Sequence, residues 1–195
     1  MKICLTGHKE GLGKAIFDQL SPMYDVMGID LPDDLNTQEG EDKFFGSVME
    51  SDVVILCANV RQVEFLEAIC EYHYSDEKKI IVIGSVIGSM QPEDFPGMPD
   101  ELVEHIEKWH DAWLEYFADK KKLKKFVTAW SNNEYFYPPA TKLQVSLLNF
   151  SQLANDHKDE SFKKVLNSLP YEKCCELIHL IIEQDVIINA EIYNG

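Results

Sequence analysis

A glycine-rich segment near the start of the chain has the spacing of a phosphate-binding loop. The segment TGHKEGLG, residues 6–13, separates an apolar run from a helical pattern. Gly7 permits a tight turn, Gly11 lets the backbone approach a pyrophosphate, and Gly13 lets the following helix pack on the strand. The start of that helix offers unpaired N–H groups and a partial positive charge to the phosphates. In this strand–turn–helix context the pattern predicts a bound nicotinamide dinucleotide, and a glycine turn without a ligand is the alternative.

An acidic residue follows at the distance that such loops require. Asp30 ends the second apolar run, about twenty residues beyond the loop. A carboxylate at this point accepts hydrogen bonds from the adenosine ribose hydroxyls and repels a 2′-phosphate, so NAD is predicted over NADP. Lys9 would weaken this preference by neutralising a phosphate, and Glu10 would strengthen it. A solvated aspartate at a strand end is the alternative.

Predicted strands and helices alternate along most of the chain and would position these residues. The alternation favours an α/β three-layer Rossmann fold, with a mostly parallel, doubly wound sheet and helices on both faces. All 195 residues fit one domain. We expect strands at residues 2–7, 24–30, 52–60, 79–85 and 186–195, and helices at 11–21, 41–49, 61–74 and 171–184. The turn-rich stretch 32–37 has room for a very short strand.

The stretch from residue 90 to about 136 breaks this alternation, and we interpret it as an inserted helical segment. Apolar residues within 100–118 fall on one helical stripe. They are Leu102, Val103, Ile106, Trp109, Trp113, Leu114 and Phe117. Residues 125–130 then resemble a strand. Pro138 and Pro139 suit the first turn of a helix that runs to about Ala154, and residues 162–170 resemble a strand and turn.

Taken in order, these motifs resemble the short-chain dehydrogenase/reductase family. The spacing Thr6-Gly7-x-x-x-Gly11-x-Gly13 matches the loop of that family, and "KIIVIGSVIG" matches its catalytic-serine strand, with Ser85 as the serine. Residues 140–154 resemble its active-site helix, with Lys142 as the catalytic lysine. Residues 52–60 take the place of its Asn-Asn-Ala-Gly strand, of which only Ala58 matches. The cofactor-binding residues implied by the loop and the resemblance are Thr6, Gly7, Lys9, Glu10, Gly11, Leu12, Gly13, Asp30, Asp34, Leu35, Ala58, Asn59 and Lys142.

The family's general acid/base is a tyrosine four residues before the lysine, and this position holds Pro138 here. A phenol has an ordinary pKa near ~10, and a neighbouring ammonium favours its ionised form. Residues four apart share a helix face, whereas Tyr137 is five residues before Lys142. The residue before a proline favours extended backbone, so Tyr137 could still reach Lys142, or it could only pack at the helix start. The segment YFADK, residues 116–120, has the right spacing but is out of order with the family's strands.

The resemblance implies an oxidoreductase that transfers hydride between a nicotinamide and a small alcohol or carbonyl. Ser85 would polarise the substrate, Tyr137 would transfer the proton, and Lys142 would assist both. A catalytically inactive dinucleotide-binding protein with a regulatory or redox-sensing role is the alternative, because Pro138 replaces the tyrosine. An assembly protein without ligand is a third hypothesis. Residues 90–136 would form a lid over the substrate or a subunit interface, and the family implies a homodimer or homotetramer.

The composition argues against several other classes of function. The 34 acidic and 18 basic residues give a net charge of −16, which repels phosphate backbones, so nucleic-acid binding is not expected. No apolar run is long enough to cross a bilayer, and the chain starts on a predicted strand without a leader, so we expect a cytoplasmic protein without membrane contact. The histidines and cysteines lack metal-ligand or disulfide spacing, so we expect no metal and buried, reduced thiols.

Overall fold

The computed structural model describes residues 1–30, 37–59, 61–73, 76–85, 110–132, 142–150, 153, 169–184 and 186–192. Within these residues, parallel strands form one six-stranded sheet in the order β2-β1-β3-β4-β5-β6. The strands are β1 (Lys2–Thr6), β2 (Asp25–Ile29), β3 (Val53–Leu56), β4 (Lys79–Ser85), β5 (Gln144–Phe150) and β6 (Asn189–Ile192). The helices are α1 (Gly11–Leu20), α2 (Gln38–Glu50), α3 (Gln62–His73), α5 (His110–Ser131) and α7 (Tyr171–Glu183).

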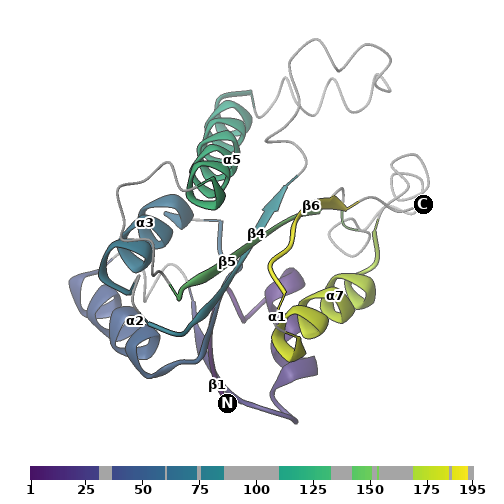
Figure 1. The fold of residues 1–195 in the computed structure, drawn as a ribbon. Helices are drawn as coiled ribbons and strands as arrows, with labels where there is room; N and C mark the ends of the chain where they lie inside the picture. Colours follow the sequence, from purple (N-terminus) through teal and green to yellow (C-terminus); the bar gives the residue numbers. More distant parts are fainter. Residues whose placement is uncertain are drawn as a thin grey trace.

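Helices cover both faces of the sheet, which confirms the predicted three-layer α/β fold. α1 and α7 lie on one face, and α2, α3 and α5 lie on the other (Figure 1). Strand β3 shows why its sequence is apolar throughout. Val53 and Ile55 pack in the cluster under α1 and α7, whereas Val54 and Leu56 pack in the cluster under α3 and α5. Successive side chains point to opposite faces of a strand, so a sheet buried on both sides needs an unbroken apolar run.

The predicted helix from Pro138 to about Ala154 is wrong, because residues 144–150 form strand β5. β5 pairs in parallel with β4, from Gln144 opposite Lys79 to Phe150 opposite Ser85. Val145 packs in the cluster under α3 and α5, and Leu148 packs in the cluster on the other face. A strand buried on both faces loses the alternation of apolar and polar residues that distinguishes a strand from a helix. The periodicity of this run was therefore a poor guide.

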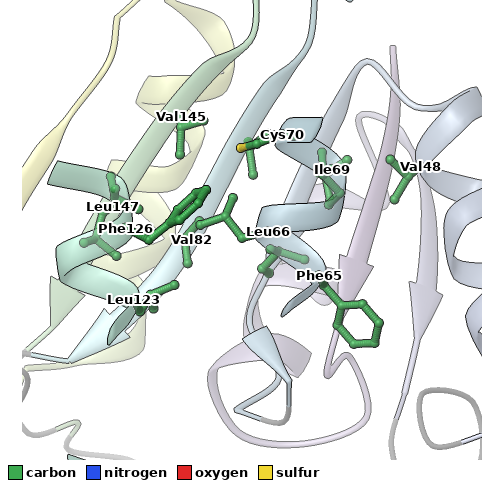
Figure 2. Close-up of a cluster of buried hydrophobic side chains, with 14 of the residues drawn as sticks. Val48, Phe65, Leu66, Ile69, Cys70, Val82, Leu123, Phe126, Val145 and Leu147 are labelled. Carbon is green, nitrogen blue, oxygen red and sulfur yellow. The ribbon is translucent and has the colours of Figure 1, made fainter. Parts of the chain in front are cut away.

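The predicted strand at residues 125–130 is also wrong, because these residues belong to α5. Residues 110–131, expected as part of an insertion, form a helix in the connection between the parallel strands β4 and β5. Parallel strands need a crossover connection, which is usually a helix. Leu123, Phe126, Val127 and Trp130 are buried in the cluster that α5 shares with α3 and the sheet. Figure 2 shows Leu123 and Phe126 among side chains from α3, β4 and β5. α5 is thus part of the core of the fold.

The remaining predicted elements agree with the structure to within a few residues. These are the strands β1 to β4, the final strand β6 and the helices α1, α2, α3 and α7. The lid and subunit-interface hypotheses concern residues 90–136, and the described part of that stretch is mostly α5, which packs in the core. Residues 86–109 and 133–141 lie outside the described part of the chain, so for them both hypotheses stay predictions. Most of the predicted strand at 162–170 also lies outside it, although Leu169 forms a bridge with Leu153. Among the helices that the structure describes, we find none with the length and apolar character to span a membrane.

Candidate active site

The carboxyl ends of the strands gather most of the predicted site residues along one edge of the sheet. Thr6 ends β1, Asp30 follows β2, Ala58 and Asn59 follow β3, and Ser85 ends β4. All these strands run in the same direction, so their carboxyl ends must meet at a common edge. Open parallel sheets bind their ligands outside this edge. The candidate site is therefore here.

The glycine loop makes the tight turn that its sequence predicts. Gly7 has a φ of 77° and Gly11 a φ of 55°, a backbone conformation that other residues rarely adopt. The Gly7 N–H donates to the carbonyl oxygen of Ile29, 2.8 Å away. A Cβ atom on Gly13 would lie 1.9 Å from the carbonyl oxygen of Gly7, so only glycine allows α1 to start this close to the turn.

The start of α1 is open to an anion. Glu10, at the N-cap, makes no side-chain capping bond, and the first turn of α1 has no acidic residue. α2 differs, because Thr37 Oγ1 accepts a hydrogen bond from the Gly40 N–H at 3.1 Å. The first N–H groups of a helix need an acceptor, and they carry a partial positive charge. The geometry at the start of α1 suits a phosphate.

The Thr6 side chain joins the glycine loop to the turn after β3. Its Oγ1 accepts hydrogen bonds from the N–H of Cys57 at 3.0 Å and from the N–H of Ala58 at 3.1 Å. Thr6 is buried, and a Cβ on Gly7 would lie 3.1 Å from the Ala58 nitrogen. The loop after β1 and the turn after β3 are therefore fixed against each other.

Asp30 lies next to the glycine loop and forms an ion pair with Lys9 of that loop. It is buried, and Lys9 Nζ lies 3.5 Å from Asp30 Oδ2, with most of the lysine in solvent. The other two residues predicted to contact the adenosine, Asp34 and Leu35, lie outside the described residues. The structure thus places one carboxylate and one ammonium beside the predicted ribose position.

A lysine outside the predicted set, Lys120, lies beside Asn59 at the carboxyl end of β3. Lys120 of α5 is only 3% exposed, and its Nζ donates to Asn59 Oδ1 at 2.9 Å and to Gln62 Oε1 at 2.7 Å. The same Nζ lies 5.3 Å from the ring centroid of Tyr116, one helical turn away. Burial lowers the pKa of Lys120 from 10.5 to about 8, because desolvation disfavours the ammonium more than nearby Cys57 and Asp119 favour it. Tyr116 and Lys120, a lysine with a lowered pKa, therefore share one face of α5 next to Asn59, which follows β3.

The structure does not bring the predicted lysine and serine together. Ser85 lies at the carboxyl end of β4, whereas Lys142 is exposed and comes two residues before β5. The start of β5 pairs with the start of β4, so Lys142 lies at the opposite edge of the sheet from Ser85. Tyr137 lies outside the described residues.

A signal in the sequence could have identified Lys120. It lies on the stripe of α5 that also carries Leu123, Val127 and Trp130, all buried, at spacings of three and four residues. A lysine within an apolar stripe is unusual and indicates a specific partner. The segment YFADK is out of order with the family's strands only while residues 140–154 are interpreted as the active-site helix. With residues 144–150 as strand β5, α5 is the next described element after the strand of Ser85, and the order of the motifs matches the family.

The described residues contain no group of three or more histidine, cysteine or acidic side chains that could hold a metal ion.

Comparisons with known proteins find likeness in the fold. No protein-family model matches the chain, and no curated protein sequence matches it. The 3-alpha-hydroxysteroid dehydrogenase from Pseudomonas sp. B-0831, solved with NADH, superposes with a TM-score of 0.65 at 16% identity, over 100% of this chain and 96% of that one. Serine dehydrogenase from Escherichia coli gives 0.63 at 14% identity, over 98% and 97%. A short chain dehydrogenase from Burkholderia cenocepacia J2315, in complex with NADP, gives 0.62 at 11% identity, over 99% and 96%. The chain has the fold of these dehydrogenases.

Proposed function

We propose that this chain is a nicotinamide-dependent oxidoreductase of the short-chain dehydrogenase/reductase kind, which interconverts an alcohol and a carbonyl group on a small molecule. The observation that carries the proposal is the buried Lys120, held by Asn59 and set against Tyr116, at the sheet edge where the glycine loop and Ser85 also lie. Two of the structures with this fold contain NADH or NADP, which supports a dinucleotide in the same place. Assembly into a dimer or tetramer stays a prediction.

The residues at the loop fit a dinucleotide. The uncapped start of α1 would hold the pyrophosphate, and the absence of a Cβ at Gly13 keeps that helix end close to the strand. Asp30 would accept hydrogen bonds from the ribose hydroxyls of the adenosine half, which favours NAD. Lys9 beside it would lessen the penalty for a 2′-phosphate. When bound, the cofactor supplies the exchange of hydride with the substrate carbon.

The side chains around Lys120 would perform the proton transfer. The Tyr116 hydroxyl donates a proton to the substrate oxygen during reduction and takes it back during oxidation. The Lys120 ammonium, on the same helix face, stabilises the phenolate that forms when the proton leaves. The Ser85 hydroxyl donates a hydrogen bond to the substrate oxygen and holds it in place. Asn59 and Gln62 keep Lys120 at this position.

The test compares two tyrosines in the full chain. NADH binding is measured by fluorescence titration, and turnover is measured as NADH oxidation across a panel of small aldehydes and ketones. Tyr116→Phe should lower kcat at least ~100-fold, because it removes the proton donor, while the Kd for NADH stays within about twofold. Tyr137→Phe is the matched control and should retain turnover.

Other outcomes are equally informative. Loss of turnover in Tyr137→Phe, with Tyr116→Phe unaffected, would return the catalytic role to the tyrosine that the sequence pattern favoured. NADH binding without turnover on any carbonyl would favour the alternative of a cofactor-binding regulatory protein. If neither NADH nor NADPH binds, the chain keeps only the scaffold of a dehydrogenase.

A further inference from the structure

Gln62 joins three elements through a single side-chain amide. It is the first residue of α3 and is 6% exposed. Its Nε2 donates to the carbonyl oxygens of Leu56 at 2.7 Å and Ile83 at 2.9 Å, and its Oε1 accepts from Lys120 Nζ at 2.7 Å. The side chain therefore contacts β3, β4 and α5 at once.

This position requires a primary amide. The pairing of β3 with β4 ends at Leu56 opposite Val82, so the Leu56 and Ile83 carbonyls lie where the ladder stops. An amide offers two N–H donors for these carbonyls and one oxygen for the ammonium. A carboxylate has no donor for them, and an aliphatic side chain satisfies none of the three groups. Only asparagine and glutamine combine two N–H donors on one nitrogen with an oxygen acceptor.

The turn before α3 is arranged to direct Gln62 inward. Arg61 has a φ of 52°, a left-handed conformation that is uncommon for a residue with a side chain. Its guanidinium donates to Glu41 of α2 and to Glu64 of α3, and it stacks over the Phe65 ring at 5.0 Å from the centroid. These contacts stabilise the backbone of Arg61 in this conformation, and the side chain of the next residue, Gln62, is buried.

We propose that Gln62 is a positioning residue that fixes the Lys120 ammonium beside Tyr116 and favours its charged form. Its effect on the charge of Lys120 is independent of any ligand, whereas its effect on turnover rests on the proposed function. A role as a strand tie alone is the competing explanation, because the amide also joins β3 to β4. The two explanations differ in what they predict for the titration of Lys120.

Two substitutions separate them by the sign of their effect. Gln62→Met removes the acceptor, so the pKa of Lys120 should fall by about one pH unit. Gln62→Glu keeps an acceptor and adds a negative charge, so the same pKa should rise by at least as much. Both remove donors from the Leu56 and Ile83 carbonyls, so a strand tie alone predicts lower stability in both without opposite shifts. The other ionisable groups described near the Lys120 charge, Cys57, Asp119 and Tyr116, are unchanged in both variants.

The measurement is an NMR titration of the full chain with labelled lysine. The Lys120 signal is identified by its absence in Lys120→Arg, and its midpoint is followed from pH 6 to pH 11. Ser146→Ala is the control, because Ser146 of β5 is buried and its Oγ accepts from the N–H of Ile188, just before β6, at 3.0 Å. This variant should lose stability without moving the Lys120 midpoint. Unchanged midpoints in both Gln62 variants, or shifts in the same direction, overturn the proposal.

The result can be read separately from the proposed function. If Gln62→Met does not fold, Gln62→Glu decides alone, since an upward shift supports the proposal and an unchanged midpoint overturns it. In the kinetic arm, Gln62→Met should lower kcat about tenfold at pH 7 and displace the pH profile with the NMR midpoint, with KM little changed. Failure of wild-type protein to bind NADH contradicts the proposed function and leaves the titration result standing. NADH turnover combined with unshifted Lys120 midpoints supports the proposed function and contradicts the role of Gln62.

Discussion

Lys120 carries a charge in a place that water barely reaches, and the folded state bears the cost at neutral pH. The hydrogen bonds to Asn59 and Gln62 recover part of the lost hydration, and the Tyr116 ring adds a weak attraction. Burial nonetheless lowers the pKa of Lys120 to about 8, so the net effect of the surroundings disfavours the ammonium. A residue that destabilises the fold is expected where its chemistry is needed.

The stability of the wild type relative to Lys120→Met should therefore rise with pH. Below pH 8 the lysine is charged in both the folded and the unfolded chain, so the full cost of its burial applies. Between about 8 and 10.5 the folded chain loses the proton first, and the cost disappears. The difference in unfolding free energy should change by on the order of 3 kcal/mol across this window. Urea unfolding of both proteins at several pH values measures it, and a flat difference would contradict a buried ammonium.

Asp30 should determine the choice between the two dinucleotides. Asp30→Asn keeps an acceptor but removes the charge that opposes a 2′-phosphate, and it leaves the Lys9 ammonium without its 3.5 Å partner. The Kd ratio of NADPH to NADH should fall by roughly tenfold, or ~1.4 kcal/mol. Asp18→Asn is the control, because Asp18 is exposed on α1 and pairs with Lys14. Equal ratios in the wild type and Asp30→Asn would move the discrimination to another residue.

At the scale of elements, α5 both packs in the hydrophobic core and carries Lys120 of the candidate site. One stripe of this helix packs on α3, β4 and β5, with Leu123 and Phe126 among their side chains (Figure 2). The same stripe carries Lys120, whose Nζ reaches Asn59 after β3. Packing of the helix and placement of the lysine are therefore not separable. Side chains deep in this stripe, such as Leu123 and Val127, therefore set the position of Lys120 through packing alone.

Leu123→Ala tests this coupling. Leu123 is almost fully buried and lies three residues after Lys120, so the substitution should cost about 2–5 kcal/mol of unfolding free energy. It should also lower kcat more than it raises the Kd for NADH, because the cavity lets the Lys120 turn of α5 shift. Lys122→Ala, an exposed neighbour paired with Asp119 at 3.6 Å, should change stability by less than about 1 kcal/mol. Urea unfolding and steady-state kinetics on the three proteins give the comparison.

The fold and the glycine loop could be predicted from the sequence, but the positions of the candidate lysine and tyrosine could not. The glycine loop, Asp30 and the strand ending in Ser85 were predicted because each has a local signature of turn, charge or unbroken apolar run. The run that forms β5 resembles a helix in sequence because burial on both faces removes its alternation. This one misassignment is why the pattern points to Lys142 and not to Lys120, the lysine proposed above for the proton transfer. The contact of Lys120 with Gln62, far apart in sequence, has no local signature.

At the scale of the whole molecule, two apolar clusters pack the sheet against its helices, whereas the excess acidic side chains repel one another. The chain carries a net charge of −16. Surface ion pairs, such as that between Lys2 and Glu50, involve largely exposed side chains and contribute little. Compaction brings the excess negative charges together, which opposes folding. The folded state therefore relies on burial more than on its surface charges.

Added salt should stabilise this protein, in contrast to one held by surface ion pairs. The Debye length falls from about 30 Å at 0.01 M to about 10 Å at 0.1 M, which screens the long-range repulsion first. Raising NaCl from 0.01 M to 0.3 M should add about 1 kcal/mol of unfolding free energy, or roughly 2–4 °C in Tm for a chain of this size. Scanning calorimetry at fixed pH measures the change, and sucrose at equal osmolarity controls for solvent exclusion. A Tm that falls with NaCl would show that specific ion pairs outweigh the repulsion, and the weak contribution assigned to pairs such as Lys2–Glu50 would then be wrong.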